Sequence, residues 1–226
     1  RFSSMPDGFS VDNCFSHRNE EPVMSEPNAL PQTVPVWDLP TRLFHWILVA
    51  LMIVQWLTAE SDGAMQYHVW GGYAVLTLVL FRLIWGFVKA LLRGETPLYL
   101  GHNPMGGWSI LALLTLLLIQ AGTGLFANDD ITFDGPLSGW VSRSMSNWLT
   151  TVHKVNFNLL LLVIAAHISA VLFYLLVKRE NLIHPMLSGR KRLPPEQAEA
   201  APRMVSSWLG LAALLVAAVA VGLLVR

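Results

Sequence analysis

The 226-residue sequence is poor in charged residues and has only one cysteine, Cys14. Charged residues make up 13% of the chain, about half of the usual share for a soluble domain, while hydrophobic residues reach 54%. This composition excludes a disordered chain. The balance of 15 Lys and Arg against 15 Asp and Glu excludes a nucleic-acid binder that depends on a basic field. A disulfide-stapled domain is excluded too, which leaves an integral membrane protein.

Five apolar runs are each long enough to cross a bilayer, for which a helix needs about 20 largely apolar residues. They are Leu43–Ala59, lengthened by Trp37–Arg42, then Tyr67–Leu92, Trp108–Ala127, Trp148–Val177 and Val205–Val225. Barrel strands would be shorter and would alternate in polarity. The sequence therefore predicts an all-α integral membrane protein with five spanning helices.

Positive charges gather at one end of these spans. That end carries nine of them: Arg42, Lys89, Arg93, Lys178, Arg179, Arg190, Lys191, Arg192 and Arg203. The opposite end carries three: Arg143, Lys154 and Arg226. Because cytoplasmic loops are enriched in Lys and Arg, we expect a bacterial inner (plasma) membrane protein with a cytoplasmic N-terminus.

Two polar stretches flank the apolar core 36–177. Residues 1–35 are rich in Pro, Ser, Asn and acids, which predicts a disordered cytoplasmic tail. Met24 offers an alternative start, which would make residues 1–23 foreign to the native protein. Residues 178–204 contain four prolines and predict a cytoplasmic linker to the fifth span, 205–226.

Four of the seven histidines fall within the spans. His153 and His167 are 14 residues apart, which places them on one helix face and about 21 Å apart along it. His68 lies at the outer end of the second span, and His45 lies near the cytoplasmic start of the first. By depth they form an outer pair, His68 with His153, and an inner pair, His45 with His167.

Ionisable side chains in lipid are costly and mark functional sites. Two imidazoles that face each other at one depth can bind both axial positions of a haem iron. Zinc fits less well because it takes four ligands, or three and a water, and covalent haem would need a C-x-x-C-H motif. Two non-covalent b-type haems are favoured. A histidine-lined proton or small-solute transporter and a membrane anchor subunit of a redox enzyme remain alternatives.

The segment Val36–Trp46, VWDLPTRLFHW, resembles the opening signature of the prokaryotic cytochrome b561 family. This family includes b-type cytochrome subunits of nickel–iron hydrogenases and of thiosulfate reductases. Shorter similarities occur at His68–Tyr73, Gly101–Trp108, Gly124–Asp130 and Leu175–Asn181, so the resemblance covers roughly 36–192.

The resemblance implies a four-helix transmembrane bundle that holds two haems through the four intramembrane histidines, with the fifth helix peripheral to it. It implies electron transfer between a quinone or quinol and a periplasmic redox protein, a c-type cytochrome or an iron–sulfur subunit. Membrane lipid is a further expected partner, and no nucleic acid is expected. Small residues on the fifth span, Gly210, Ala213, Ala217 and Ala218, suit assembly, including a homo-oligomer.

Further polar residues suit the haem propionates or a quinone. Arg82 lies 14 residues from His68, hence on the same face at the inner level, and no Asp or Glu lies within the first four spans to pair with it. Arg42 and Lys154 flank histidines and are further propionate candidates, with snorkelling to the membrane surface as the alternative. His102 and Asn103, in the loop before the third span, are candidates for quinone or propionate contacts, with simple solvation as the alternative.

Overall fold

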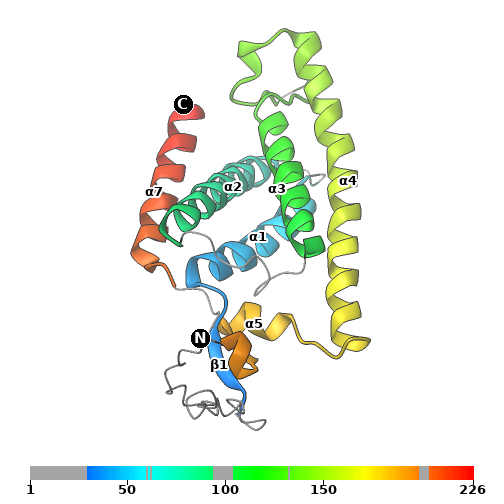
Figure 1. Ribbon diagram of the computed structural model, residues 1–226. Helices are drawn as coiled ribbons and strands as arrows, with labels where there is room; N and C mark the ends of the chain where they lie inside the picture. The colour runs from blue at the N-terminus through cyan, green and yellow to red at the C-terminus, as the bar shows by residue number, and fades with distance from the viewer. Residues whose placement is uncertain (1–29, 60, 62, 94–103, 132, 199–203) are drawn as a thin grey trace, which may run out of the picture. The chain divides into compact units, whose positions relative to one another are not determined.

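The computed structural model describes residues 30–59, 61, 63–93, 104–131, 133–198 and 204–226. Its five membrane-spanning helices are α1 (Leu39–Thr58), α2 (Met65–Arg93), α3 (Pro104–Gly124), α4 (Arg143–Leu176) and α7 (Ser207–Leu224) (Figure 1). The shorter elements are β1 (Gln32–Pro35), a 3-10 turn (Ser138–Trp140), α5 (Ile183–Ser188), β2 (Arg190–Leu193) and α6 (Pro195–Ala198). The predicted all-α membrane fold with five spans is confirmed.

Two spanning helices begin before their apolar runs because a side chain caps each of them. Asp38 accepts a hydrogen bond from the backbone N–H of Thr41 at 2.8 Å, so α1 begins at Leu39. Ser142 caps α4 in the same way, through the N–H of Met145. Such caps satisfy backbone donors that have no partner within the helix.

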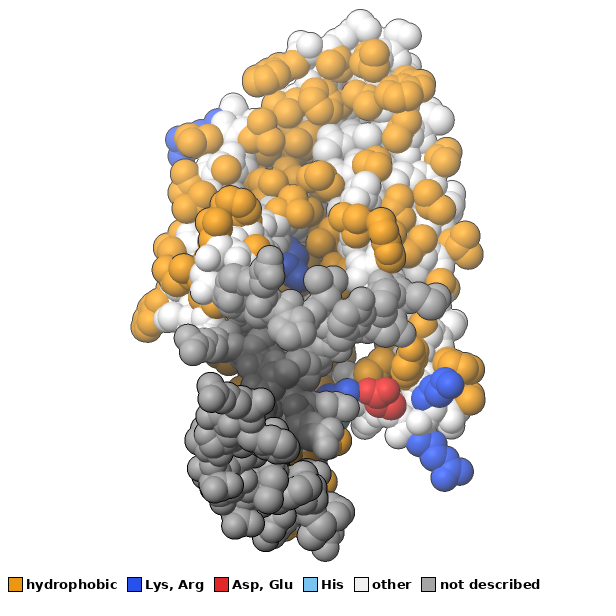
Figure 2. Space-filling model, viewed as in Figure 1, with side chains coloured by type: hydrophobic (Ala, Val, Ile, Leu, Met, Phe, Trp, Pro, Cys, Tyr) orange, Lys and Arg blue, Asp and Glu red, His pale blue; other side chains and the backbone are white. Residues whose placement is uncertain are grey.

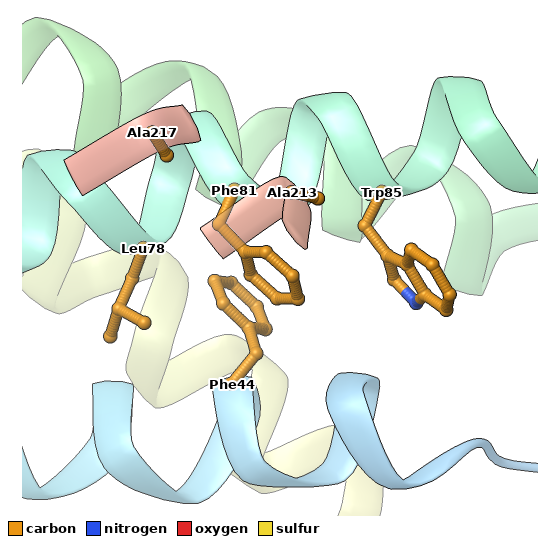
Figure 3. Close-up of a cluster of buried hydrophobic side chains, with 6 residues drawn as sticks. All are labelled: Phe44, Leu78, Phe81, Trp85, Ala213 and Ala217. Carbon is orange, nitrogen blue, oxygen red and sulfur yellow. The ribbon is translucent and has the colours of Figure 1, made fainter. Parts of the chain in front are cut away.

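Helix α2 packs against α1, α3 and α7, and α3 packs against α4. Figure 3 shows the cluster of buried side chains that joins α1, α2 and α7. Its members are Phe44, Leu78, Phe81, Trp85, Ala213 and Ala217. The rings of Phe81 and Trp85 stack with their planes 12° apart. The core of the described chain is therefore centred on α2.

The small-residue face of α7 is used within the chain. Gly210, Ala213 and Ala217 are buried towards α2, while Ala218 is exposed. A Cβ on Gly210 would lie 2.7 Å from a ring carbon of Pro40, so glycine allows α7 to approach α1 closely. We expected this face to serve assembly, but three of its four small residues pack against other helices of the same chain.

A two-stranded sheet lies just before the start of α1. Strand β1 pairs antiparallel with β2, with Pro35 opposite Arg190, so a strand forms at the end of the segment expected to be a disordered tail. Helices α5 and α6, with β2, lie within the segment expected to be a linker. The backbone N–H groups of Val36 and Trp37 both donate to the carbonyl of Gly189. The segment that leads into α1 is thereby tied to the turn between α5 and β2.

Apolar side chains cover much of the outside of the long helices (Figure 2). On α4, for example, Val155 and Leu162 are 63% and 66% exposed. In water such surfaces would favour aggregation, whereas in a bilayer they face lipid chains. The exposed surface thus agrees with a multi-pass membrane protein.

Candidate functional site: two histidine pairs

The outer pair brings His68 from the start of α2 against His153 from α4. Their ring centroids are 6.3 Å apart and their planes are 77° apart. Nδ1 of His68 lies 3.1 Å from the backbone carbonyl oxygen of Gln55, and Nδ1 of His153 lies 2.9 Å from that of Gln120. Because a carbonyl can only accept, each Nδ1 carries the proton and donates it. Nε2 of each ring is left as the basic nitrogen.

This donor set fits a metal with two axial imidazoles. A metal–imidazole bond is about 2 Å and the ring centroid lies about 1 Å behind Nε2, so two imidazoles on one metal have centroids roughly 6 Å apart. The observed 6.3 Å agrees with that value. Histidine ligands also usually donate their other nitrogen to a carbonyl or carboxylate, which fixes the ring. Both rings of the outer pair have this second contact.

Gly124 gives the ring of His153 its space. A Cβ on Gly124 would lie 3.0 Å from Cε1 of His153, a contact short enough that the ring would have to shift by a few tenths of an ångström. Gly122 lies two residues earlier on the same helix, and a Cβ added there would meet no neighbouring atom of the described chain within 4 Å. A side chain at Gly124 would therefore displace the imidazole, whereas one at Gly122 would not.

The inner pair comes from two helices: His45 lies near the start of α1 and His167 in the second half of α4, near enough for charge on one ring to act on the other. Nδ1 of His45 is buried and has no hydrogen-bond partner among the described residues. The ring lies edge-on to Trp46, with centroids 5.0 Å apart. A buried imidazole nitrogen with no polar partner is costly unless a ligand compensates it. The residue types again suit a metal with one imidazole from each helix, but no carbonyl of the described chain orients His45.

Within the described chain, no three His, Cys, Asp or Glu side chains come together as a metal site. Each level offers two imidazoles and nothing more from these residues. Zinc would require at least a third protein ligand, whereas a haem iron has four of its ligands in the macrocycle. The residues present therefore fit haem, at both levels, better than they fit zinc.

A buried polar cluster at the start of α1 was not among the predictions from the sequence. The Asp38 carboxylate, 4% exposed, accepts hydrogen bonds from Trp85 Nε1 at 3.1 Å and from Lys89 Nζ at 2.8 Å, besides capping α1. Lys89 also donates to Thr41 Oγ1. Burial opposes ionisation of this carboxylate, but the hydrogen bonds and the charge of Lys89 outweigh it and lower the pKa of Asp38 to about 2. This cluster joins the start of α1 to the second half of α2.

The proposed propionate residues have different surroundings. Arg42 donates through Nη1 to the carbonyl of Leu187, and Trp46 Nε1 donates to that of Met186, so both hold α5 over the start of α1. Arg82 interacts electrostatically with Asp38, an acid that precedes the first helix and so lies outside the apolar spans. Lys154 is exposed beside His153. His102 and Asn103 lie outside the described residues.

Three comparisons place these observations among known proteins. Residues 36–189 match the family described as "Prokaryotic cytochrome b561". A "Probable Ni/Fe-hydrogenase B-type cytochrome subunit" from Bradyrhizobium diazoefficiens is 23% identical, over 71% of this chain and 86% of that protein. A protein of the same description from Rhizobium leguminosarum bv. viciae is 22% identical, over 71% of this chain and 89% of its own length. No solved structure matches the chain.

Proposed function

Because this chain belongs to the prokaryotic cytochrome b561 family and is a membrane-embedded b-type cytochrome of electron transport, we propose that it carries two haems b. The outer pair would hold one iron and the inner pair the other. The observation that carries this proposal is the outer pair itself: two imidazoles 6.3 Å apart, each with Nδ1 bonded to a carbonyl.

Haem iron, when bound, supplies one-electron redox chemistry between its ferric and ferrous forms. The protein's part is to fix the ligands and to tune their surroundings. The carbonyls of Gln55 and Gln120 hold the outer imidazoles in one tautomer. On α4 the two ligand positions, His153 and His167, are 14 residues apart, about 21 Å along the helix axis. Electrons would thus pass from one side of the bilayer to the other within one chain.

We propose a quinone or quinol as one redox partner, at the end of the inner pair, and a redox protein on the periplasmic side as the other. The similarity to hydrogenase cytochrome subunits supports a nickel–iron hydrogenase, through its iron–sulfur subunit, as that protein. The excess of Lys and Arg near the inner pair supports a cytoplasmic N-terminus in the inner membrane.

The experiment is a reduced-minus-oxidised visible spectrum of the purified protein, with a pyridine haemochrome assay for haem type and haem-to-chain ratio. We expect b-type haem at two per chain, reducible by a soluble quinol analogue. A ratio of one would contradict the assignment of both pairs. A colourless protein that is correctly inserted would contradict the proposal and favour the histidine-lined transporter.

A further inference from the structure

A cavity of about 420 Å³ lies where the start of α1, the turn between α5 and β2, and the start of α7 meet. Arg42, Arg190 and Ser207 line it, one from each of these three segments. No described histidine lines it. The cavity is therefore distinct from both histidine pairs.

The lining offers positive charge with little compensation. Nε of Arg42 is buried and has no hydrogen-bond partner among the described residues, although Nη1 is bonded to Leu187. The one acid among the described lining residues is Asp38, and its carboxylate already accepts bonds from Trp85 and Lys89. An anion in the cavity would thus meet two guanidinium groups and no free carboxylate from the described residues.

The start of α7 adds backbone donors. Ser206, at the N-cap position, makes no side-chain capping bond. The first hydrogen bond of this 18-residue helix runs from the N–H of Leu209 to Ser206, so the N–H groups of Ser207 and Trp208 precede it. A helix N-terminus with free N–H groups attracts anions, phosphate in particular. Here it adds to the two arginines, which are the independent evidence for an anion.

The position of the cavity indicates the source of that anion. Helices α1 and α7 both begin beside it and both cross the membrane, so it lies at the bilayer surface. Leu39 and Met204 line it and are 46% and 38% exposed, which gives it an apolar rim. The cytoplasmic leaflet contains anionic lipids, and basic pockets between spanning helices on that side bind their head groups. We propose that this cavity binds the phosphate group of an anionic phospholipid, with the acyl chains lying along α1 and α7.

This inference goes beyond electron transfer and is tested on the purified holoprotein in detergent by native mass spectrometry. Phosphatidylglycerol is titrated into the protein, with phosphatidylcholine as the zwitterionic comparison and inorganic phosphate as a competitor. Two variants weaken the site: Arg190→Gln removes a charge, and Ser207→Asp places a carboxylate at the start of α7. Since an acid at a helix start stabilises the helix, Ser207→Asp keeps the fold while it repels phosphate. Arg192→Gln is the matched control, two residues further along β2 and outside the cavity lining.

We expect phosphatidylglycerol to bind tightly, and each site variant to weaken it about tenfold or more, the value of one charge-assisted hydrogen bond. Arg192→Gln should change the affinity less than about twofold, and haem content should stay at the wild-type level in all three. Equal binding of the two lipids, or an equal loss in Arg192→Gln, would overturn the proposal. Displacement of the lipid by millimolar inorganic phosphate would assign the site to free phosphate instead, and loss of haem in Ser207→Asp would assign it to the cofactor.

Discussion

The outer and inner pairs are held in different ways. Backbone carbonyls orient both His68 and His153, whereas Nδ1 of His45 has no partner among the described residues. The surroundings differ as well. Neutral hydrogen-bonding groups contact the outer rings, for example the hydroxyl of Thr123, 3.3 Å from His153, and the charged Lys154 beside it is exposed. Seven residues before His45, Asp38 forms an ion pair with Lys89, and Arg82 lies within range of the Asp38 charge.

This difference indicates that the chain would influence a bound haem through ligand geometry at the outer level and through charge at the inner level. At the outer level the chain sets the geometry of the ligands before any cofactor binds, because each ring already has its second hydrogen bond. For the inner pair the chain supplies the charges of Asp38, Lys89 and Arg82, which would shift the balance between oxidised and reduced iron in a haem bound there. We therefore expect the outer haem to respond most to steric changes and the inner haem to changes of charge.

The largest effect should come from removing a ligand. His68→Ala or His153→Ala should remove the outer haem and spare most of the inner one, because in the proposed arrangement each iron would take one imidazole from each of two helices. His45→Ala or His167→Ala should do the reverse. The haem-to-chain ratio should fall from two to about one in each variant, measured by pyridine haemochrome, with the redox titration identifying which haem is lost.

A smaller steric change should act on the outer level alone. In Gly124→Ala the new Cβ would lie 3.0 Å from the His153 ring and would force it to move. Changes that disturb a ligand in this way typically reduce metal affinity about 10- to 100-fold. Haem titration of the apoprotein should show that loss for one haem only. Gly122→Ala is the control, since no neighbouring atom of the described chain lies within 4 Å of its added methyl, and equal losses in both variants would argue against this account.

A change of charge should act on the inner level. Arg82→Leu removes a positive charge, which favours the oxidised iron, so the inner midpoint potential should fall by on the order of 60 mV, assuming about 12 Å and a dielectric constant of about 20. Arg82→Lys should keep most of the potential. Redox titration followed by visible absorption reads both haems in one experiment. A shift confined to the outer haem, or no shift, would show that Arg82 does not act on the inner level.

The smallest expected effect is that of pH, acting through Asp38, on retention of the inner haem. The pKa of Asp38 lies below its ordinary value of 3.8, so the stabilisation from its bonds to Lys89 is complete above about pH 4 and is lost as the pH falls through about 2. Between about pH 5 and 8, retention of the inner haem should therefore not change through Asp38. When haem retention is measured at several pH values in this range, the difference between the wild type and Asp38→Asn should be the same at each of them. A difference that grows as the pH rises through this range would contradict the low pKa.

The five spans, and the common face of His153 and His167 on α4, could be predicted because they depend on local periodicity. Fourteen residues between His153 and His167 determine both their separation and their common face, whatever the rest of the fold does. The cluster around Asp38 could not be predicted in the same way. Its partners Trp85 and Lys89 are 47 and 51 residues distant, and only the packing of α2 on α1 brings them together. The one local signal was an acid just before an apolar run that contains an early proline, which is typical of a helix start.

The same reason explains β1 and the role of Arg42. The partner of β1 lies more than 150 residues away, in β2, and four residues with no apolar alternation predict no strand. Arg42, three residues before His45, was predicted as a propionate candidate, which stays a prediction, whereas its Nη1 bond to Leu187, 145 residues away, could not be predicted. Long-range contacts of this kind follow from the topology, which composition and periodicity do not specify.

The central claim is that the irons are held by His68 with His153 and by His45 with His167. The haem content of double variants tests it most directly. We expect the same-level variant His45→Ala/His167→Ala to keep about one haem per chain, and the cross-level variant His45→Ala/His153→Ala to keep almost none. If the cross-level variant retained one haem while the same-level variant retained none, the pairing by depth would be contradicted.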